Sequence, residues 1–389
     1  MQIKRTIESS IRAAFGQYPV VTITGPRQSG KTTLAKTLFP GKPYRTLEHP
    51  RIRLLAERDP EGFLAAFPDG AVLDEVQRVP GLLSYIQGIV DDKGRNGLFV
   101  LTGSSNLLLM KNVSQTLAGR TAVFTLLPFS AEECAAVRPL PDAASAVLFG
   151  GYPRVLAGGA RPDTFFSSYI GTYVERDVRQ LLNIKDAMVF STFLRLLAGR
   201  IGSLLDVTSL SNDCGVSAKT VREWLSILAT SYICFLLPPW YENRGKRLVK
   251  SPKLYFYDTG IACALAGIDT VGQLMRDPLR GGLFENLVVL EKMKAAFHAG
   301  KRPDLYFYRD SNGVEVDLVE QAGGRLFPTE IKSSATFSPD FCKSLSKFAE
   351  RYPDKCERPS VIYCGSERFA FKGVDVQPFP SAPGASALR

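Results

Sequence analysis

The stretch ITGPRQSGKTTLAKTLF, which starts at Ile23, constrains the fold more than any other part of this sequence. It places two glycines, a lysine and a threonine in the spacing Gly-x-x-x-x-Gly-Lys-Thr, after a β-branched run and before a helical run. Such glycines let backbone N–H groups turn toward phosphates, while the lysine reaches the β/γ oxygens and the threonine hydroxyl binds Mg²⁺. The sequence therefore predicts a site for ATP and Mg²⁺. The predicted contact residues are Gly25, Pro26, Arg27, Gln28, Ser29, Gly30, Lys31, Thr32 and Thr33.

Two later runs supply the polar residues that a nucleotide triphosphatase also needs. AVLDEVQ offers Asp74 for the Mg²⁺ shell and Glu75 as general base for the attacking water. LFVLTGSSN ends in candidate γ-phosphate sensors, of which we favour Ser104 or Asn106. Arg120 in TLAGR is expected to be a charge-neutralising finger, a γ-phosphate sensor or an arginine in solvent.

The alternation of patterns predicts three domains. From residue 20 to about 127, β-branched runs alternate with helical stretches, which is typical of a parallel sheet with crossover helices. From about 156 to 240 the apolar residues recur at helical spacing, and from about 271 onward helix and strand patterns mix. We predict boundaries that give domains 1–155, 156–270 and 271–389.

Composition indicates a cytoplasmic protein with no membrane segment. No apolar run approaches the roughly 18 residues of a membrane helix, and the start MQIKRTIESSIRAAFG contains an acid and is unlike a signal peptide. The seven scattered cysteines form no Cys-x-x-Cys pair, which favours reduced thiols. The net charge of +10 suits an anionic partner, although it serves solubility equally well.

The middle of the chain carries a candidate DNA-binding surface. SLSNDCGVSAKTVREWLSIL predicts helix, turn and helix, with Ser217 as the N-cap of the second helix. That helix would expose Lys219 and Arg222 to DNA, and a protein-docking module is the alternative. The following segment is a candidate β wing, whose cations are Arg244, Lys246, Arg247, Lys250 and Lys253.

The stretch NGVEVDLVEQAGGRLFPTEIKSS predicts two strands joined by a glycine turn, with polar residues in the order of a metal-dependent nuclease. Asp317 and Glu330 would bind Mg²⁺, and Lys332 would orient water and balance charge at the scissile phosphate. A preceding amphipathic helix provides a third acid, Glu285. A surface ion pair and a chemically idle nuclease scaffold remain alternatives.

Several motifs together resemble prokaryotic AAA-type ATPases in which a phosphate-loop domain precedes a C-terminal domain of unknown function. They are GPRQSGKTTL, AVLDEVQ, LTGSSN, LAGR and LLPFSAEE, followed by GGYPRV, YVERDV, YFYDTGI and FENLV. The resemblance implies an α/β protein with an N-terminal AAA-type parallel-sheet ATPase domain, a helical winged-helix middle domain and a C-terminal α/β restriction-nuclease-like domain. It departs from the nuclease motif at Val316, where that motif has proline.

We therefore expect an ATP-hydrolysing protein that binds DNA and carries a C-terminal centre for metal-dependent cleavage. The alternative is an ATP-driven regulatory or protein-interaction switch with an idle nuclease fold. Self-association stays open.

Overall fold

The computed structural model describes residues 3–104, 115–178, 184, 186–243 and 251–379. Contacts divide the chain into two compact units, each of which is described by itself. The first contains Met1–Phe129 together with Thr230–Tyr232 and Lys294–Arg302, and the second contains the remainder. The three domains expected from the sequence stay a prediction.

The first unit is built on a five-stranded sheet in the order β2-β3-β4-β1-β5. All four strand pairs are parallel, which confirms the predicted parallel sheet with crossover helices. The strands are β1 (Val20–Thr24), β2 (Tyr44–Thr46), β3 (Val72–Asp74), β4 (Phe99–Gly103) and β5 (Thr121–Thr125). The helices are α1 (Glu8–Phe15), α2 (Lys31–Leu38), α3 (Pro50–Arg58), α4 (Pro60–Ala65), the 3₁₀ turn η1 (Val76–Arg78) and α5 (Leu82–Lys93).

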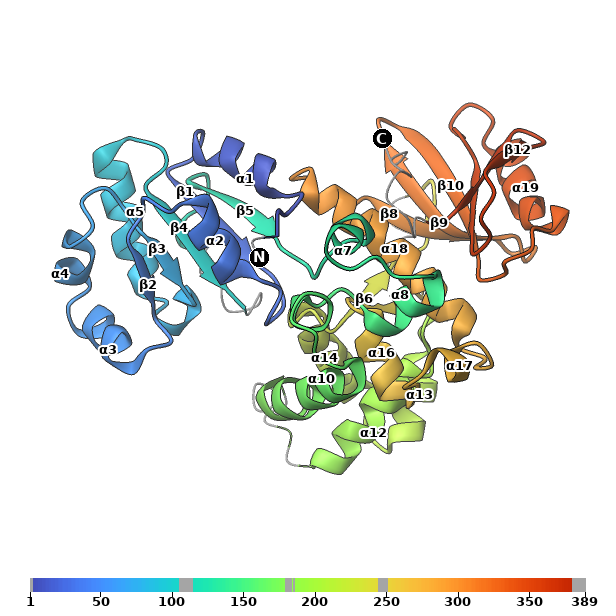
Figure 1. The fold of residues 1–389 in the computed structure, drawn as a ribbon, viewed down its shortest axis with the longest axis horizontal. Coiled ribbons are helices and arrows are strands. Elements are labelled where there is room, and N and C mark those ends of the chain that lie inside the picture. Colours follow the sequence, from blue (N-terminus) through green and yellow to red (C-terminus); the bar gives the residue numbers. More distant parts are fainter. Residues whose placement is uncertain (1–2, 105–114, 179–183, 185, 244–250, 380–389) are drawn as a thin grey trace. The chain divides into compact units, whose positions relative to one another are not determined.

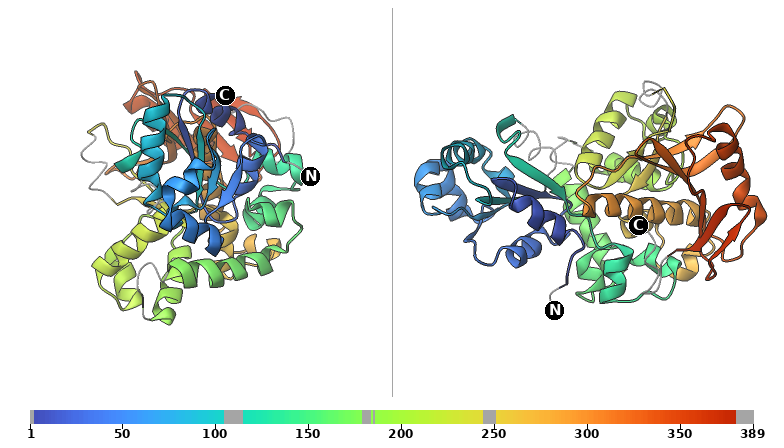
Figure 2. Two further views of the ribbon diagram at one scale, coloured as in Figure 1. Left: turned by 90° about the vertical axis from the view of Figure 1, so that its left-hand side faces the viewer. Right: turned by 90° about the horizontal axis from the view of Figure 1, so that it is seen from above.

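Helices cover both faces of this sheet (Figures 1 and 2), and alternating side chains of β1 pack into two separate cores. Val21 and Ile23 pack in one cluster with residues of α1 and α2, whereas Val20 packs in the other cluster with residues of α4 and α5. A parallel sheet covered by helices on both faces gives nearly continuous apolar strands, and β1 is buried along its whole length. The polar residues that follow the strands are thereby held at one rigid edge.

The second unit begins with helices and a short hairpin. The helices are α7 (Ala131–Val137), α8 (Ala143–Phe149), α9 (Pro153–Leu156), α10 (Pro162–Tyr169), the π-helical turn η2 (Ile170–Val178), α12 (Ala187–Ala198), α13 (Val207–Cys214), α14 (Ala218–Thr230), α16 (Thr259–Ala266), α17 (Val271–Leu274) and α18 (Arg280–His298). The last residue of α14 and the end of α18 from Lys294 are assigned to the first unit. The hairpin pairs β6 (Cys234–Leu237) antiparallel with β7 (Lys253–Phe256). Every residue of β7 is buried, so this strand is part of the core.

The same unit ends in a six-stranded sheet of order β12-β13-β11-β10-β9-β8, drawn in orange and red in Figure 1. Its strands are β8 (Leu305–Arg309), β9 (Glu315–Ala322), β10 (Arg325–Lys332), β11 (Ser360–Tyr363), β12 (Phe369–Phe371) and β13 (Val374–Pro378). β8, β9 and β10 form an antiparallel meander, and β11 lies parallel to β10 after the turn η3 (Pro339–Cys342) and α19 (Lys343–Arg351). β9 and β10 meet at Gly323 and Gly324, both with positive φ, which confirms the predicted glycine turn.

Among the described residues, no helix combines the length and apolar character that crossing a membrane requires.

Candidate functional site

The phosphate loop lies between β1 and α2, as its sequence predicts. Gly25 has φ +147°, and a Cβ there would come within 2.2 Å of the backbone oxygen of Leu126. Gly30 has φ +97° in the left-handed region and immediately precedes Lys31, the first residue of α2. Both glycines are required sterically, because a side chain would clash at the first position and strain the backbone at the second. The loop can therefore present its N–H groups at the helix N-terminus, where anions bind.

Lys31 points into this loop. Its ammonium donates hydrogen bonds to the backbone oxygens of Gly25 (3.0 Å) and Pro26 (2.7 Å). Burial lowers the pKa of Lys31 to about 8, against the opposing effect of the nearby carboxylates of Glu75 and Asp74. An anion in the loop would stabilise the charged form, so this lysine is set up to gain from phosphate.

Asp74, at the end of β3, is surrounded by hydroxyl groups. Thr32 Oγ1 lies 3.1 Å from both carboxylate oxygens, and Tyr44 donates to Oδ2 at 2.7 Å. Thr102, from β4, also donates to Asp74. A hydroxyl beside a carboxylate is a pair of hard oxygen ligands, which is the chemistry that Mg²⁺ prefers. Thr32 and Asp74 thus fit the predicted metal role, with nucleotide phosphates and water needed to complete the shell.

Glu75 follows directly and is oriented by two neighbours. Its backbone is left-handed, with φ +57°. Ser104 donates to Glu75 Oε2 at 2.9 Å, and the amide of Gln77 donates to the same oxygen. Ser104, which we expected to sense γ-phosphate, is thus placed as a neighbour of the predicted base. The alternative candidate for the γ-phosphate sensor, Asn106, lies outside the described residues.

The position of Arg120 contradicts one of the roles expected for it, that of a γ-phosphate sensor. It precedes β5, whose first residue pairs with Val20 and whose last pairs with Thr24, after which the phosphate loop begins. A strand of this length separates the two edges by about 13 Å. Arg120 instead forms a two-point ion pair with Asp91 of α5, at 2.6 and 2.8 Å. The γ-phosphate sensor role within its own chain is therefore wrong; a finger acting on a second copy stays a prediction.

Arg5 supports the loop and was not found by sequence reasoning. Its guanidinium is buried and donates to the backbone oxygens of Ser29 (3.0 Å) and Leu127 (2.8 Å). It also lies 4.8 Å from the ring centroid of Phe129. An arginine near a chain start is ordinarily assigned to solvent, and no local spacing marks this one.

The predicted helix–turn–helix is present as α13 and α14. Gly215 adopts φ +68° between the helices, and Ser217 accepts the backbone N–H of Thr220 as the expected N-cap. The apolar face of α14 is buried and consists of Val221, Trp224, Leu225 and Leu228. Lys219 and Arg222 are exposed on the same helix. The expected wing residues Arg244, Lys246, Arg247 and Lys250 lie outside the described residues.

The C-terminal acids and Lys332 converge as the strand order predicts. Lys332 lies 2.7 Å from Glu330 Oε1 and 3.3 Å from Asp317 Oδ2. Asp317 Oδ2 also accepts the backbone N–H of Ile331 at 2.8 Å. The Asp317 and Glu330 side chains are both strongly buried, unlike those of an exposed surface ion pair.

Lys253 completes this cluster and overturns its expected role as a DNA-contacting wing cation. Its side chain is only 4% exposed, because β7 places it inside the unit. Its ammonium lies 2.8 Å from Glu285, 2.7 Å from Glu315 and 3.8 Å from Asp317. Glu285 also accepts a 2.5 Å hydrogen bond from Tyr255. We name Lys253, Glu285, Glu315, Asp317, Glu330 and Lys332 the C-terminal charge cluster.

Burial and neighbouring negative charge raise the pKa of two acids in this cluster. Burial, with the charge of Asp317 as the next cause, raises the pKa of Glu285 and of Glu330 above the ordinary range. Three carboxylates surround Lys253, and their charge raises its pKa despite burial. Within the described part of the chain, no three acidic, histidine or cysteine side chains are arranged to hold a metal ion. The ammonium groups stand between the carboxylates instead.

Comparison with known proteins divides the chain into three matched segments. Residues 17–135 match the family described as "AAA domain", whereas 141–271 and 280–382 match two domains of unknown function, DUF8612 and DUF4143. The chain is similar to the Walker-type ATPase PABY2304 of Pyrococcus abyssi, at 14% identity and a TM-score of 0.46, over 68% of this chain and 96% of that one.

Among curated proteins, the chain is 31% identical over 372 residues to the uncharacterized protein Rv2008c of Mycobacterium tuberculosis, covering 94% of this chain and 81% of that protein. The uncharacterized protein MJ1544 of Methanocaldococcus jannaschii is 23% identical over 63% of this chain and 57% of its own length. The AAA domain supports ATP binding and hydrolysis. By its similarity to Rv2008c, the chain belongs to that protein's family, with a phosphate-loop AAA domain in its N-terminal part.

Proposed function

We propose that the protein binds ATP·Mg²⁺ at the phosphate loop and hydrolyses ATP with Glu75 as general base. The observation that carries this proposal is the convergence of Thr32 and Asp74, 3.1 Å apart, beside a loop whose glycines could not be replaced. Thr32 and Asp74 would hold Mg²⁺, which when bound would neutralise charge on the phosphates. Lys31 would contact the β/γ-phosphate oxygens.

Glu75 has the arrangement of an oriented base. Gln77 and Ser104 both donate to Oε2, which leaves Oε1 to accept a proton from water. This placement makes Ser104 a positioning residue for Glu75.

Two substitutions distinguish ATP binding from ATP hydrolysis. Lys31→Ala is expected to weaken binding of a fluorescent ATP analogue roughly 100-fold, because charge-assisted hydrogen bonds to phosphate are lost. Glu75→Gln should retain binding but reduce phosphate release by about 10²–10⁴-fold, the usual contribution of a positioned base. Equal turnover by wild type and Glu75→Gln would reject the assignment of the base.

For the C-terminal half, we propose a DNA-binding or protein-interaction role regulated by ATP, with the charge cluster catalytically idle in this arrangement. The helix α18, the meander β8–β10, the helix α19 and the parallel strand β11 follow one another in the order compatible with a restriction-nuclease-like fold. The idle state is favoured by Lys253, whose ammonium occupies the space among three carboxylates that a divalent cation would need. DNA binding is favoured by the exposed Lys219 and Arg222 on α14.

A further inference from the structure

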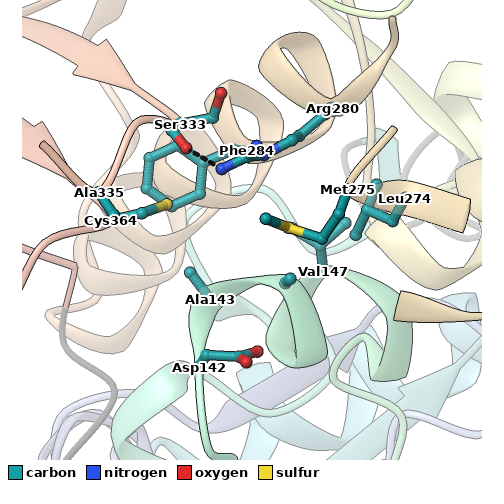
Figure 3. Close-up of a pocket in the computed structure, with 11 residues that line it drawn as sticks. Asp142, Ala143, Val147, Leu274, Met275, Arg280, Phe284, Ser333, Ala335 and Cys364 are labelled. Atoms are coloured by element: carbon teal, nitrogen blue, oxygen red, sulfur yellow. Dashed lines mark hydrogen bonds between the residues drawn. The ribbon is translucent and has the colours of Figure 1, made fainter. Parts of the chain in front are cut away.

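The second unit contains a cavity of about 200 Å³, whose lining residues appear in Figure 3. No residue of the charge cluster lines it. Its apolar wall is formed by Val147, Leu274, Met275 and Phe284, from α8, α17 and α18 and the turn after α17. The volume equals that of about seven waters in the liquid, enough for a small organic molecule. Val147, Leu274 and Phe284 are buried and belong to the folded core, whereas Met275 is 45% exposed.

A cation lies at one side of this cavity. Arg280, at the start of α18, donates one hydrogen bond to the backbone oxygen of Ser333, as Figure 3 shows. Its side chain forms no ion pair with any acid in the described part of the chain, although it is half-buried. A guanidinium stays charged and carries five N–H donors, so further donors remain for an anionic ligand.

The acid that lines the cavity, Asp142, does not neutralise the charge of Arg280. Asp142 lies on the opposite side from Arg280 in Figure 3 and accepts the backbone N–H of Ser145 at 2.7 Å as the N-cap of α8. It is exposed, so solvent screens its charge. One side of the cavity is therefore cationic and the wall between is apolar.

We propose that this cavity binds a small organic carboxylate with an apolar body, its carboxylate paired with Arg280 and its body against Leu274, Met275 and Phe284. Arginine favours carboxylates because its planar donors match their two oxygens. An apolar pocket with one well-placed charged group is the general character of a small-molecule site.

Alkylation of Cys364 can report ligand binding because this residue lines the cavity, and Cys356 serves as a matched control. Both thiols are free and half-buried, but only Cys364 lines the cavity. Because burial raises the pKa of Cys364 to about 11, alkylation by N-ethylmaleimide should be followed at pH about 9, by mass spectrometry of peptides from the full-length protein. The probe is 4-phenylbutyrate, and the neutral control of the same shape is 4-phenylbutanamide.

A ligand of this size should bind with a millimolar Kd, so the titration extends to about 10 mM. At about ten times Kd, 4-phenylbutyrate should slow alkylation of Cys364 about tenfold and leave Cys356 unchanged. The amide should protect at least several-fold less, and Arg280→Gln should remove the difference between acid and amide.

Three results would overturn the proposal. They are no protection of Cys364, equal protection of Cys356, and equal protection by acid and amide in the wild-type protein. The last comparison requires no substitution, so it stands even if Arg280→Gln fails to fold.

Discussion

The phosphate-loop site and the C-terminal charge cluster both gather lysine and carboxylates at strand ends, yet they compensate charge differently. At the first, Asp74 is held by the hydroxyls of Thr32, Tyr44 and Thr102, and Lys31 donates to backbone oxygens. At the second, Lys253 and Lys332 contact the carboxylates directly. Hydroxyl donors leave a carboxylate its charge for an incoming cation, whereas an ammonium already neutralises it. Residue types alone therefore do not define a metal site.

The largest expected effect is on stability, from removing the central ammonium of the cluster. Lys253→Met should destabilise the second unit by about 3–5 kcal/mol, because buried carboxylates lose their partner. The matched control is Lys219→Met, which removes an exposed ion pair of 4.0 Å to Glu223 and should cost at most about 0.5 kcal/mol. Urea unfolding followed by tryptophan fluorescence and circular dichroism measures both. Similar small losses for the two variants would contradict the account of Lys253 as the cation that neutralises the buried carboxylates of the cluster.

A smaller effect is expected from the residues that orient Glu75. Gln77→Leu and Ser104→Ala should each reduce kcat for ATP hydrolysis about tenfold, corresponding to one lost hydrogen bond of roughly 1.4 kcal/mol. ATP affinity should stay unchanged, since both side chains donate to Glu75. Arg120→Ala, assayed at a protein concentration where the chain is monomeric, is the matched control and should change neither quantity, because Arg120 lies at the other edge of its own sheet. A loss of ATP affinity in the Ser104 variant would restore the sensor role.

ATP binding at the phosphate loop should depend on pH. The folded pKa of Lys31 is lowered to about 8, so above that pH the free protein loses the charge that phosphate requires. ATP affinity should therefore fall as pH rises through about 8, by at most tenfold per pH unit, with proton uptake on binding. Calorimetric titration in two buffers of different ionisation enthalpy measures this. Constant affinity between pH 7 and 9.5 would contradict the assignment.

The smallest effect is expected on the surface of α14. If this helix contacts DNA, replacing Lys219 and Arg222 by Gln should reduce the dependence of log K on log salt by about one unit per lost phosphate contact. Fluorescence anisotropy with duplex DNA at several salt concentrations measures the slope, and ATP hydrolysis serves as the control. An unchanged slope would move the DNA surface elsewhere or favour protein docking.

Local sequence predicted the features whose geometry is local. The glycines and Lys31 are fixed by loop and helix start, and alternation along the strands placed Asp317, Glu330 and Lys332 on converging faces. The location of the polar residues at one edge of the sheet was also predictable, because apolar strands that are covered on both faces leave their polar residues at the strand ends.

Sequence reasoning failed where a role depends on distant contacts. Lys253 follows a basic run and was expected on a DNA-contacting β wing, but β7 buries it among acids contributed by α18 and β9. For Arg120 the sequence left a phosphate contact and an arginine in solvent open, because the choice depends on the parallel pairing of β5 with β1. Arg5 was missed because no spacing relates it to Ser29. Gln77 was overlooked although it lies only two residues after Glu75.

The central claim is that the phosphate-loop site, and not the charge cluster, accepts a divalent metal. Electron paramagnetic resonance of Mn²⁺ titrated into the full-length protein, with and without a non-hydrolysable ATP analogue, tests it most directly. We predict one bound Mn²⁺ per chain that depends on nucleotide and is lost in Asp74→Asn. Tight Mn²⁺ binding that needs no nucleotide and disappears in Asp317→Asn would contradict the account.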